Sequence, residues 1–99
     1  MRFEWDDAKA AANRRKHGVS FEEAKSVLEH PLAITVADLR HSGDEDREKT
    51  VGPSDRGRIL VVIHTRPTRK VIRIISARRA SRREIADYAE EISERLAED

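Results

Sequence analysis

Apolar residues recur with two different periods along this chain, which divides it into helical and extended parts. Residues 6–17, which are rich in alanine, are predicted to form a short helix. Gly18 ends this helix, because glycine readily adopts the left-handed conformation found at helix ends. A second helix is predicted to begin at Ser20, which forms a capping box with Glu23, and to end at His30 and Pro31. Its core face consists of apolar residues at helical spacing: Phe21, Ala24, Val27 and Leu28.

From Leu32 onward the period changes to two, which is typical of strands. Four strands are predicted, at about residues 33–38, 47–51, 59–65 and 71–77. Turn residues at 52–57 and at 66–68 predict that consecutive strands form an antiparallel meander. We therefore predict an α+β fold in which a small antiparallel sheet of about four strands is accompanied by two N-terminal helices and one C-terminal helix.

The C-terminal helix is predicted to begin at Ser81, which forms a capping box with Glu84. Its apolar stripe, which could be buried on the sheet or on a partner, consists of Ile85, Tyr88, Ala89, Ile92 and Leu96. Seven acidic residues and one arginine lie between Glu84 and Asp99. Helix stability accounts for them without any function, and the alternative is that this extension is part of a surface used by a partner protein or by a second copy. The chain of 99 residues is predicted to be a single domain, residues 1–99, with this helix and its acidic extension at 81–99.

Basic residues are concentrated in one part of the chain. Residues 56–83 include ten Arg and Lys and no Asp or Glu, although the net charge of the whole chain is only +1. A cluster of one sign attracts phosphate and releases counterions, so nucleic acid is the first partner to consider. The alternative is a solvated arginine surface that is paired with the acidic remainder of the chain.

The register of the last hairpin decides where the candidate chemistry lies. Matching the apolar faces puts Thr65 opposite Lys70, which makes His64 and Arg73 diagonal neighbours on one face. A buried arginine is costly, so Arg73 needs a carboxylate, water or an anionic ligand. Glu45 joins this patch with Arg47 in one of two registers of the preceding hairpin and is separated from it in the other; we favour the first.

RNA cleavage without a metal ion requires a base, an acid and cations around the phosphate. The candidate acids and bases are His17, Glu45 and His64. The candidate phosphate-binding cations are Lys9, Arg47, Arg66, Arg73 and Arg78. Helical spacing aligns Lys9 with Asn13, Lys16 and His17 in a polar stripe, opposite Ala8, Ala11 and Ala12, of the kind that usually faces solvent.

Other classes of chemistry are less compatible with the sequence. No cysteine is present, which excludes disulfides and thiolate sites, and no His and carboxylate pair has the spacing of a helical zinc motif. We therefore expect neither a metal nor another cofactor. The longest apolar run, residues 59–63, is too short to span a membrane, and the N-terminus lacks the pattern of a secretory signal, so a cytoplasmic location is expected.

Several motifs together resemble the BrnT family of ribonuclease toxins from type II toxin-antitoxin systems. The opening motifs are Phe3-Glu4-Trp5-Asp6, Lys9, Asn13 and Lys16-His17-Gly18-Val19-Ser20-Phe21-Glu22-Glu23-Ala24. The later motifs, in the same order, are His41-Ser42, Glu45, Arg47, Gly57-Arg58, His64-Thr65 and Ile72-Arg73-Ile74-Ile75-Ser76-Ala77-Arg78. The resemblance extends from Phe3 to about Tyr88, after which family members often end.

The resemblance implies a RelE-like fold, an RNA-cleaving activity that arrests growth by blocking translation, and a DNA-binding antitoxin that neutralises the toxin. With the residues above, it predicts a metal-independent endoribonuclease in which Arg73 and Arg78 bind the scissile phosphate. His64, His17 or Glu45 then moves protons, and a dimer or a heterotetramer with the antitoxin is possible. The alternative is a module that binds nucleic acid or an antitoxin in a repressor complex without cleaving RNA.

Overall fold

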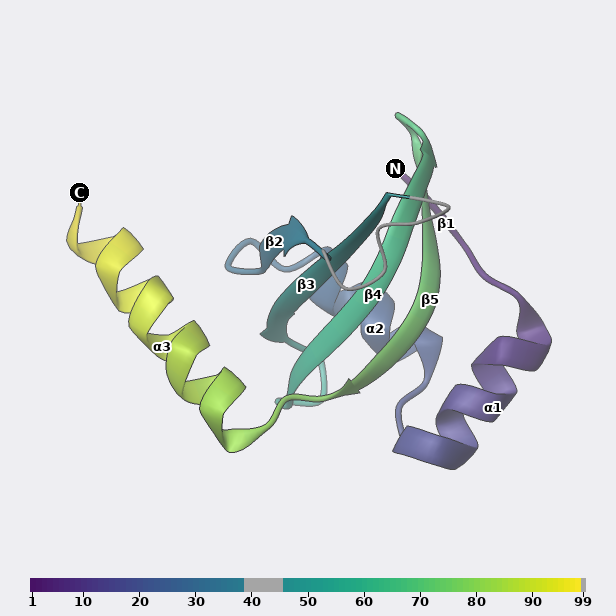
Figure 1. Cartoon of the computed structure of the whole chain (residues 1–99), viewed down its shortest axis with the longest axis horizontal. Coiled ribbons are helices and arrows are strands. Elements are labelled where there is room, and N and C mark those ends of the chain that lie inside the picture. The colour runs from purple at the N-terminus through teal and green to yellow at the C-terminus, as the bar shows by residue number, and fades with distance from the viewer. Residues whose placement is uncertain (39–45, 99) are drawn as a thin grey trace.

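A computed structural model of the protein describes residues 1–38 and 46–98. The elements, in chain order, are β1 (Arg2–Glu4), α1 (Asp7–His17), α2 (Phe21–Leu28), β2 (Ile34–Ala37), β3 (Arg47–Pro53), β4 (Ile59–Thr68), β5 (Val71–Arg79) and α3 (Arg82–Ala97). The strands form one five-stranded sheet in the order β1-β5-β4-β3-β2 (Figure 1). The predicted α+β fold and the antiparallel meander β2 to β5 are confirmed. The strand β1, which pairs parallel to β5, was not predicted, because three residues are too few to show a period.

Local capping sets the ends of the helices. The side chain of Asp6 accepts a hydrogen bond from the backbone of Lys9 at the start of α1, and Gly18 ends this helix with a φ of 68°. Ser20 caps α2 by accepting from the backbone N–H of Glu23. The predicted capping box also requires the side chain of Glu23 to accept from the backbone N–H of Ser20, and this part of the prediction is wrong. The carboxylate of Glu23 is buried and binds Ser54 and Arg58 instead. A buried carboxylate gains more from a guanidinium than from one backbone N–H.

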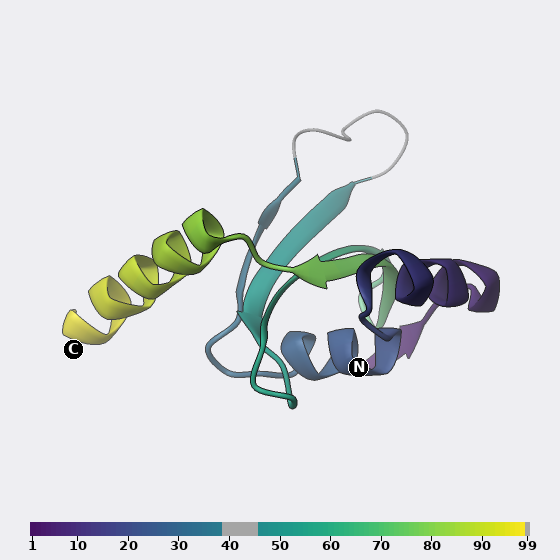
Figure 2. The ribbon, with the colours of Figure 1, turned by 90° about the horizontal axis from the view of Figure 1, so that it is seen from below.

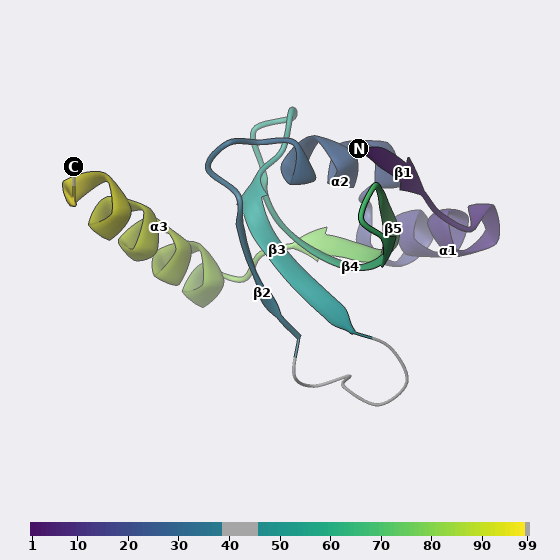
Figure 3. The same cartoon turned by 90° about the horizontal axis from the view of Figure 1, so that it is seen from above.

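The core lies between the sheet and α2. Figures 2 and 3 show α2 on the inner side of the curved sheet and α1 beside the edge strand region of β5. The buried apolar residues between these layers are Val19, Phe21, Ala24, Val27, Leu60, Val62, Ile74 and Ala77. Trp5 extends this cluster by packing edge-on against the ring of Phe21, at 6.0 Å between the ring centres. The predicted core face of α2 is therefore confirmed.

The register of the last hairpin differs from the prediction. Thr65 lies opposite Arg73 instead of Lys70, and His64 lies opposite Ile74. Two features cause this: β4 continues to Thr68, so the turn falls at residues 69–70, and the register shifts by one residue between Thr65 and Thr68. As a result His64 faces the core side of the sheet and Arg73 faces the opposite side. The predicted placement of these two residues on one face is wrong.

The helix α3 stands apart from the rest of the molecule. It leaves the end of β5 and projects away from the sheet in all three views (Figures 1, 2 and 3). None of its described residues is buried. It contacts the body through a hydrogen bond of 2.8 Å from the hydroxyl of Tyr88 to the carbonyl of Leu32, and through Glu84 in its first turn, which binds Arg78 of β5. Its apolar stripe is not buried on the sheet. Within the described residues, no helix is both long and apolar enough to cross a membrane.

Candidate functional site

The face of the sheet opposite α2 carries a cleft with several polar and charged side chains. Paired residues of neighbouring strands share a face, which places Val36, Lys49, Ile63 and Ser76 in one row across β2, β3, β4 and β5. Lys49, Ile63 and Ser76 of this row form the floor of a cleft with a volume of about 330 Å³. The polar and charged residues that line the cleft are His17, Asp38, Lys49, Ser76, Arg78 and Glu84. The cleft thus joins the end of α1, three strands and the beginning of α3.

Asn13 fixes the position of α1 beside the cleft. Its side-chain amide donates to the carbonyls of Val19 and Ala77, at 3.0 and 2.9 Å, and its side-chain oxygen accepts from the backbone N–H of Ala77 at 3.1 Å. The short strand β1 pairs only with residues 71–73 of β5, so it does not reach Ala77. The side chain of Asn13 therefore binds the backbone N–H and carbonyl of Ala77, which would otherwise be unpaired at the edge of the sheet. His17, one turn further along α1, therefore reaches the cleft. The polar stripe of α1, which was expected to face solvent, turns Asn13 and His17 toward the protein.

Arg78 enters the cleft already paired with a carboxylate. Its two terminal nitrogens donate to the two oxygens of Glu84, at 2.7 and 2.9 Å. The hydrogen bonds from Arg78 lower the pKa of Glu84 to about 2, and the backbone N–H of Ser81 adds to this effect. The capping box of α3 therefore aims Glu84 at Arg78 while it begins the helix. An incoming phosphate has to share Arg78 with this carboxylate or displace it.

Lys49 is a cleft residue that the sequence analysis missed. It lies in the middle of β3, directly opposite Ile63 of β4, so its side chain is on the open face. The segment of concentrated positive charge, residues 56–83, does not include Lys49, so the charge pattern did not indicate it. Lys49 could have been found from its spacing, because Arg47 and Lys49 are two residues apart and two such cations lie on one face of a strand.

His64 lies outside the cleft. It is fully buried on the core side of the sheet, where its Nε2 is 2.7 Å from the hydroxyl of Thr50, which is in turn 2.7 Å from the hydroxyl of Thr35. Its Nδ1 is 3.7 Å from a carboxylate oxygen of Glu48. Burial is the main cause that lowers the pKa of His64 to about 4, against the opposing effect of Glu48. At neutral pH this imidazole is uncharged.

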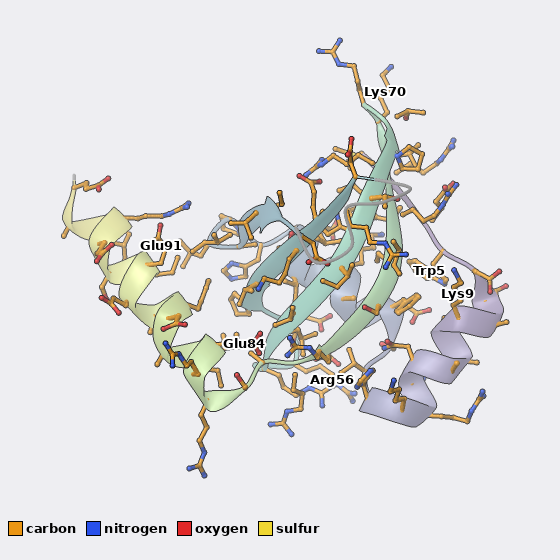
Figure 4. The ribbon with its side chains drawn as sticks, in the orientation of Figure 1. Trp5, Lys9, Arg56, Lys70, Glu84 and Glu91 are labelled. Carbon is orange, nitrogen blue, oxygen red and sulfur yellow. The ribbon has the colours of Figure 1, made fainter. Side chains whose placement is uncertain are left out.

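Arg73 and Lys9 belong to a second depression, near the N-terminus. Arg73 pairs with Glu4 at 2.7 Å, and a hollow of about 420 Å³ is lined by both residues together with Trp5, Asp6 and Lys9. Figure 4 shows Trp5 and Lys9 near each other between β5 and α1. The two cations are thus gathered in this hollow and not in the cleft.

The remaining predicted residues have separate positions. Arg47 shares the open face with Thr65 and Arg73, since the three are paired across β3, β4 and β5. Arg66 is exposed and donates to Glu48 at 2.6 Å. Glu45 lies outside the described residues. The predicted single patch is therefore divided, and among the predicted residues that the structure describes, His17 and Arg78 line the cleft.

The described part of the cleft is suited to anion binding and proton transfer. It combines an imidazole, a lysine and an arginine with the hydroxyl of Ser76. In the described residues there is no group of three or more His, Cys, Asp or Glu that could hold a metal ion.

Comparison with known proteins identifies the family. Residues 5–84 match the sequence model described as ribonuclease toxin, BrnT, of type II toxin-antitoxin system. The chain is also similar to the Brucella abortus ribonuclease toxin BrnT, whose crystal structure it matches with a TM-score of 0.64 and 26% sequence identity. That match covers 83% of this chain and 99% of the Brucella chain. No protein with a curated description matches. The chain therefore belongs to the BrnT family of ribonuclease toxins of type II toxin-antitoxin systems.

Proposed function

We propose that the cleft between α1, β3 and β5 is where this toxin cleaves RNA, and that cleavage does not require a metal ion. The observation that carries the proposal is the convergence of His17, Lys49 and Arg78 from three elements in one open cleft. These groups match the needs of a ribose-phosphate link, which are a proton acceptor and cations around the phosphate.

His17 is assigned as the proton acceptor, since within the described residues it supplies the imidazole of the cleft. It takes the proton of the ribose 2′-hydroxyl, and the 2′-oxygen attacks phosphorus. The bond to the 5′-oxygen breaks, leaving a 2′,3′-cyclic phosphate, and the 5′-oxygen acquires a proton. Lys49 and Arg78 stabilise the additional negative charge on the phosphate. Glu45 stays a prediction for the second proton transfer, on the sequence alone.

The predicted residues outside the cleft receive other roles. His64 supports the sheet through Thr50, because no substrate atom reaches a fully buried imidazole. Arg73, Lys9, Arg47 and Arg66 attract and guide the RNA chain over the open face and its edges.

Substitution of each cleft residue tests this assignment. We expect His17→Ala, Lys49→Ala and Arg78→Ala each to reduce cleavage of purified RNA by about 100-fold to 1,000-fold, as the loss of one preorganised group does in other enzymes. Arg56→Ala is the matched control, because Arg56 is an exposed cation in the turn after β3 and does not line the cleft. Undiminished cleavage by all three variants would rule out the cleft as the active site.

A second measurement concerns the metal ion and the products. Cleavage in EDTA should proceed at the full rate and yield fragments with 2′,3′-cyclic or 3′-phosphate ends. Activity that disappears in EDTA and returns with a divalent cation contradicts the metal-free mechanism. Retarded RNA without any fragments instead supports the binding module, a reading that the existing Arg78–Glu84 pair favours because that cation is already satisfied.

The partner of the toxin follows from the family, which implies an antitoxin. We propose that the antitoxin binds DNA, that it covers the cleft with carboxylates which replace phosphate, and that the complex contains more than one toxin chain. The proposed site of action is the cytoplasm. Protection of Lys49 from acetylation in the purified complex, compared with the free toxin, tests the covering of the cleft.

A further inference from the structure

The apolar stripe of α3 does not face the body of the protein. The side of α3 that faces β2 and β3 carries Glu84, Asp87, Tyr88 and Glu91, which border a groove of about 180 Å³. Successive residues of a helix are about 100° apart, so the stripe is turned away from this side by about a third of a turn. Tyr88, which was predicted to belong to the stripe, faces the groove, so the stripe consists of Ile85, Ala89, Ile92 and Leu96. Ile85 is 42% exposed and Leu96 is 62% exposed, so neither is covered by the rest of the chain.

The stripe has the spacing of a seam between two paired helices. Ile85 and Ile92 are one heptad apart, as are Ala89 and Leu96, so they occupy the d and a positions of a coiled coil. The positions that flank such a seam are occupied by Ala86, Tyr88, Ser93 and Arg95, none of which is acidic. The acidic residues of α3 are directed to the other positions. Two copies of this helix can therefore meet along their stripes without bringing like charges into contact.

We infer that α3 pairs with α3 of a second copy of this chain in an antiparallel arrangement. In the symmetric register, Ile85 lies opposite Leu96 of the second copy, and Ala89 lies opposite Ile92 of the second copy. In the middle of the seam the small Ala89 of each copy packs against the large Ile92 of the other, which allows the two helices to approach closely.

The charges at the ends of α3 favour the antiparallel orientation. Arg82 begins the helix and Glu98 caps its end, and both charges oppose the dipole of their own helix. In an antiparallel pair the cationic first turn of one copy lies beside the anionic last turn of the other. A parallel pair would instead place like charges side by side at both ends.

The pairing lies outside the part of the chain that defines the family. The family match ends at residue 84, so most of α3 follows the matched region. A seam of two heptads is short compared with the interfaces of permanent dimers. The dimer therefore forms at micromolar concentrations and exchanges with the monomer.

Sedimentation velocity of the full-length toxin tests the inference. The mass should rise with concentration from 11.3 kDa toward twice that value, whereas Ile92→Glu should hold it at the monomer mass. Ala97→Glu is the matched control, because it adds the same charge off the seam, and it should behave like the parent chain. A parent chain that stays monomeric throughout, or an Ile92→Glu variant that dimerises equally, overturns the inference. Helicity and RNA cleavage of Ile92→Glu should match the parent, which separates this test from the proposed function.

Cysteine pairing tests the orientation, since the chain contains no cysteine of its own. An oxidised mixture of Ile85→Cys and Leu96→Cys chains should give disulfide-linked heterodimers. Either variant alone should give none, because equivalent positions are about 16 Å apart along an antiparallel pair. Linked homodimers of a single variant overturn the antiparallel arrangement.

Discussion

Replacement of Asn13 by alanine should destabilise the protein strongly, although Asn13 is a small polar residue on a surface helix. The substitution removes three buried hydrogen bonds, two from its amide to Val19 and Ala77 and one to its oxygen from Ala77. Each bond contributes about 1 kcal/mol, and alanine returns about 0.6 kcal/mol through its higher helix propensity. The expected loss is therefore about 2.5 kcal/mol, which corresponds to a fall in Tm of about 10–20 °C for a domain of this size.

Urea and thermal unfolding followed by circular dichroism measure this loss. Arg15→Ala is the control, because Arg15 is exposed on the same helix, and its free energy of unfolding should stay within about 0.5 kcal/mol of the parent. Asn13→Ala should also slow RNA cleavage at temperatures where it remains folded, by about 10-fold or more, because His17 loses its fixed position relative to Arg78. A loss of stability below about 1 kcal/mol would refute the argument that Asn13 satisfies the edge of β5.

Two further predictions concern stability and pH. His64 has a folded pKa of about 4, below its unfolded value of 6.5, so its contribution is present above pH 6.5 and is lost as the pH falls toward 4. The free energy of unfolding should fall by about 2 kcal/mol from this cause between pH 7 and pH 5, and His64→Gln should remove that part of the slope in urea titrations; an unchanged slope contradicts the burial of a neutral imidazole. Glu84 has a pKa lowered to about 2 from 4.5 by Arg78, so its contribution of about 1 kcal/mol, after screening by solvent, is lost between pH 4.5 and pH 2 and should be absent in Glu84→Gln.

The sequence by itself determined the local elements and the family. Gly18, Ser20 and Ser81 mark helix ends by chemistry that acts within a few residues, and the structure has helix ends at those positions. The apolar spacing of α2 and of the strands likewise depends on neighbours along the chain. The motifs that resemble the BrnT family are also a property of the sequence, and the family match confirms them.

The composition of the cleft depended on the tertiary structure. A period of two shows which residues of one strand share a face, but it does not show how two strands are aligned. The extension of β4 to Thr68 and the register shift between Thr65 and Thr68 fixed that alignment, and together they placed His64 and Arg73 on opposite faces of the sheet.

The approach of α1 to the cleft was also decided at the tertiary level. His17 lines the same cleft as Arg78 because Asn13 binds Ala77, a contact between residues 64 positions apart in the chain. Such a contact follows from where β1 stops pairing with β5 and leaves backbone groups of β5 to be satisfied, which no local pattern encodes. The sequence therefore supplied the residue types of the cleft, whereas their assembly in one place depended on the alignment of the strands and on the edge of β5 that β1 leaves unpaired.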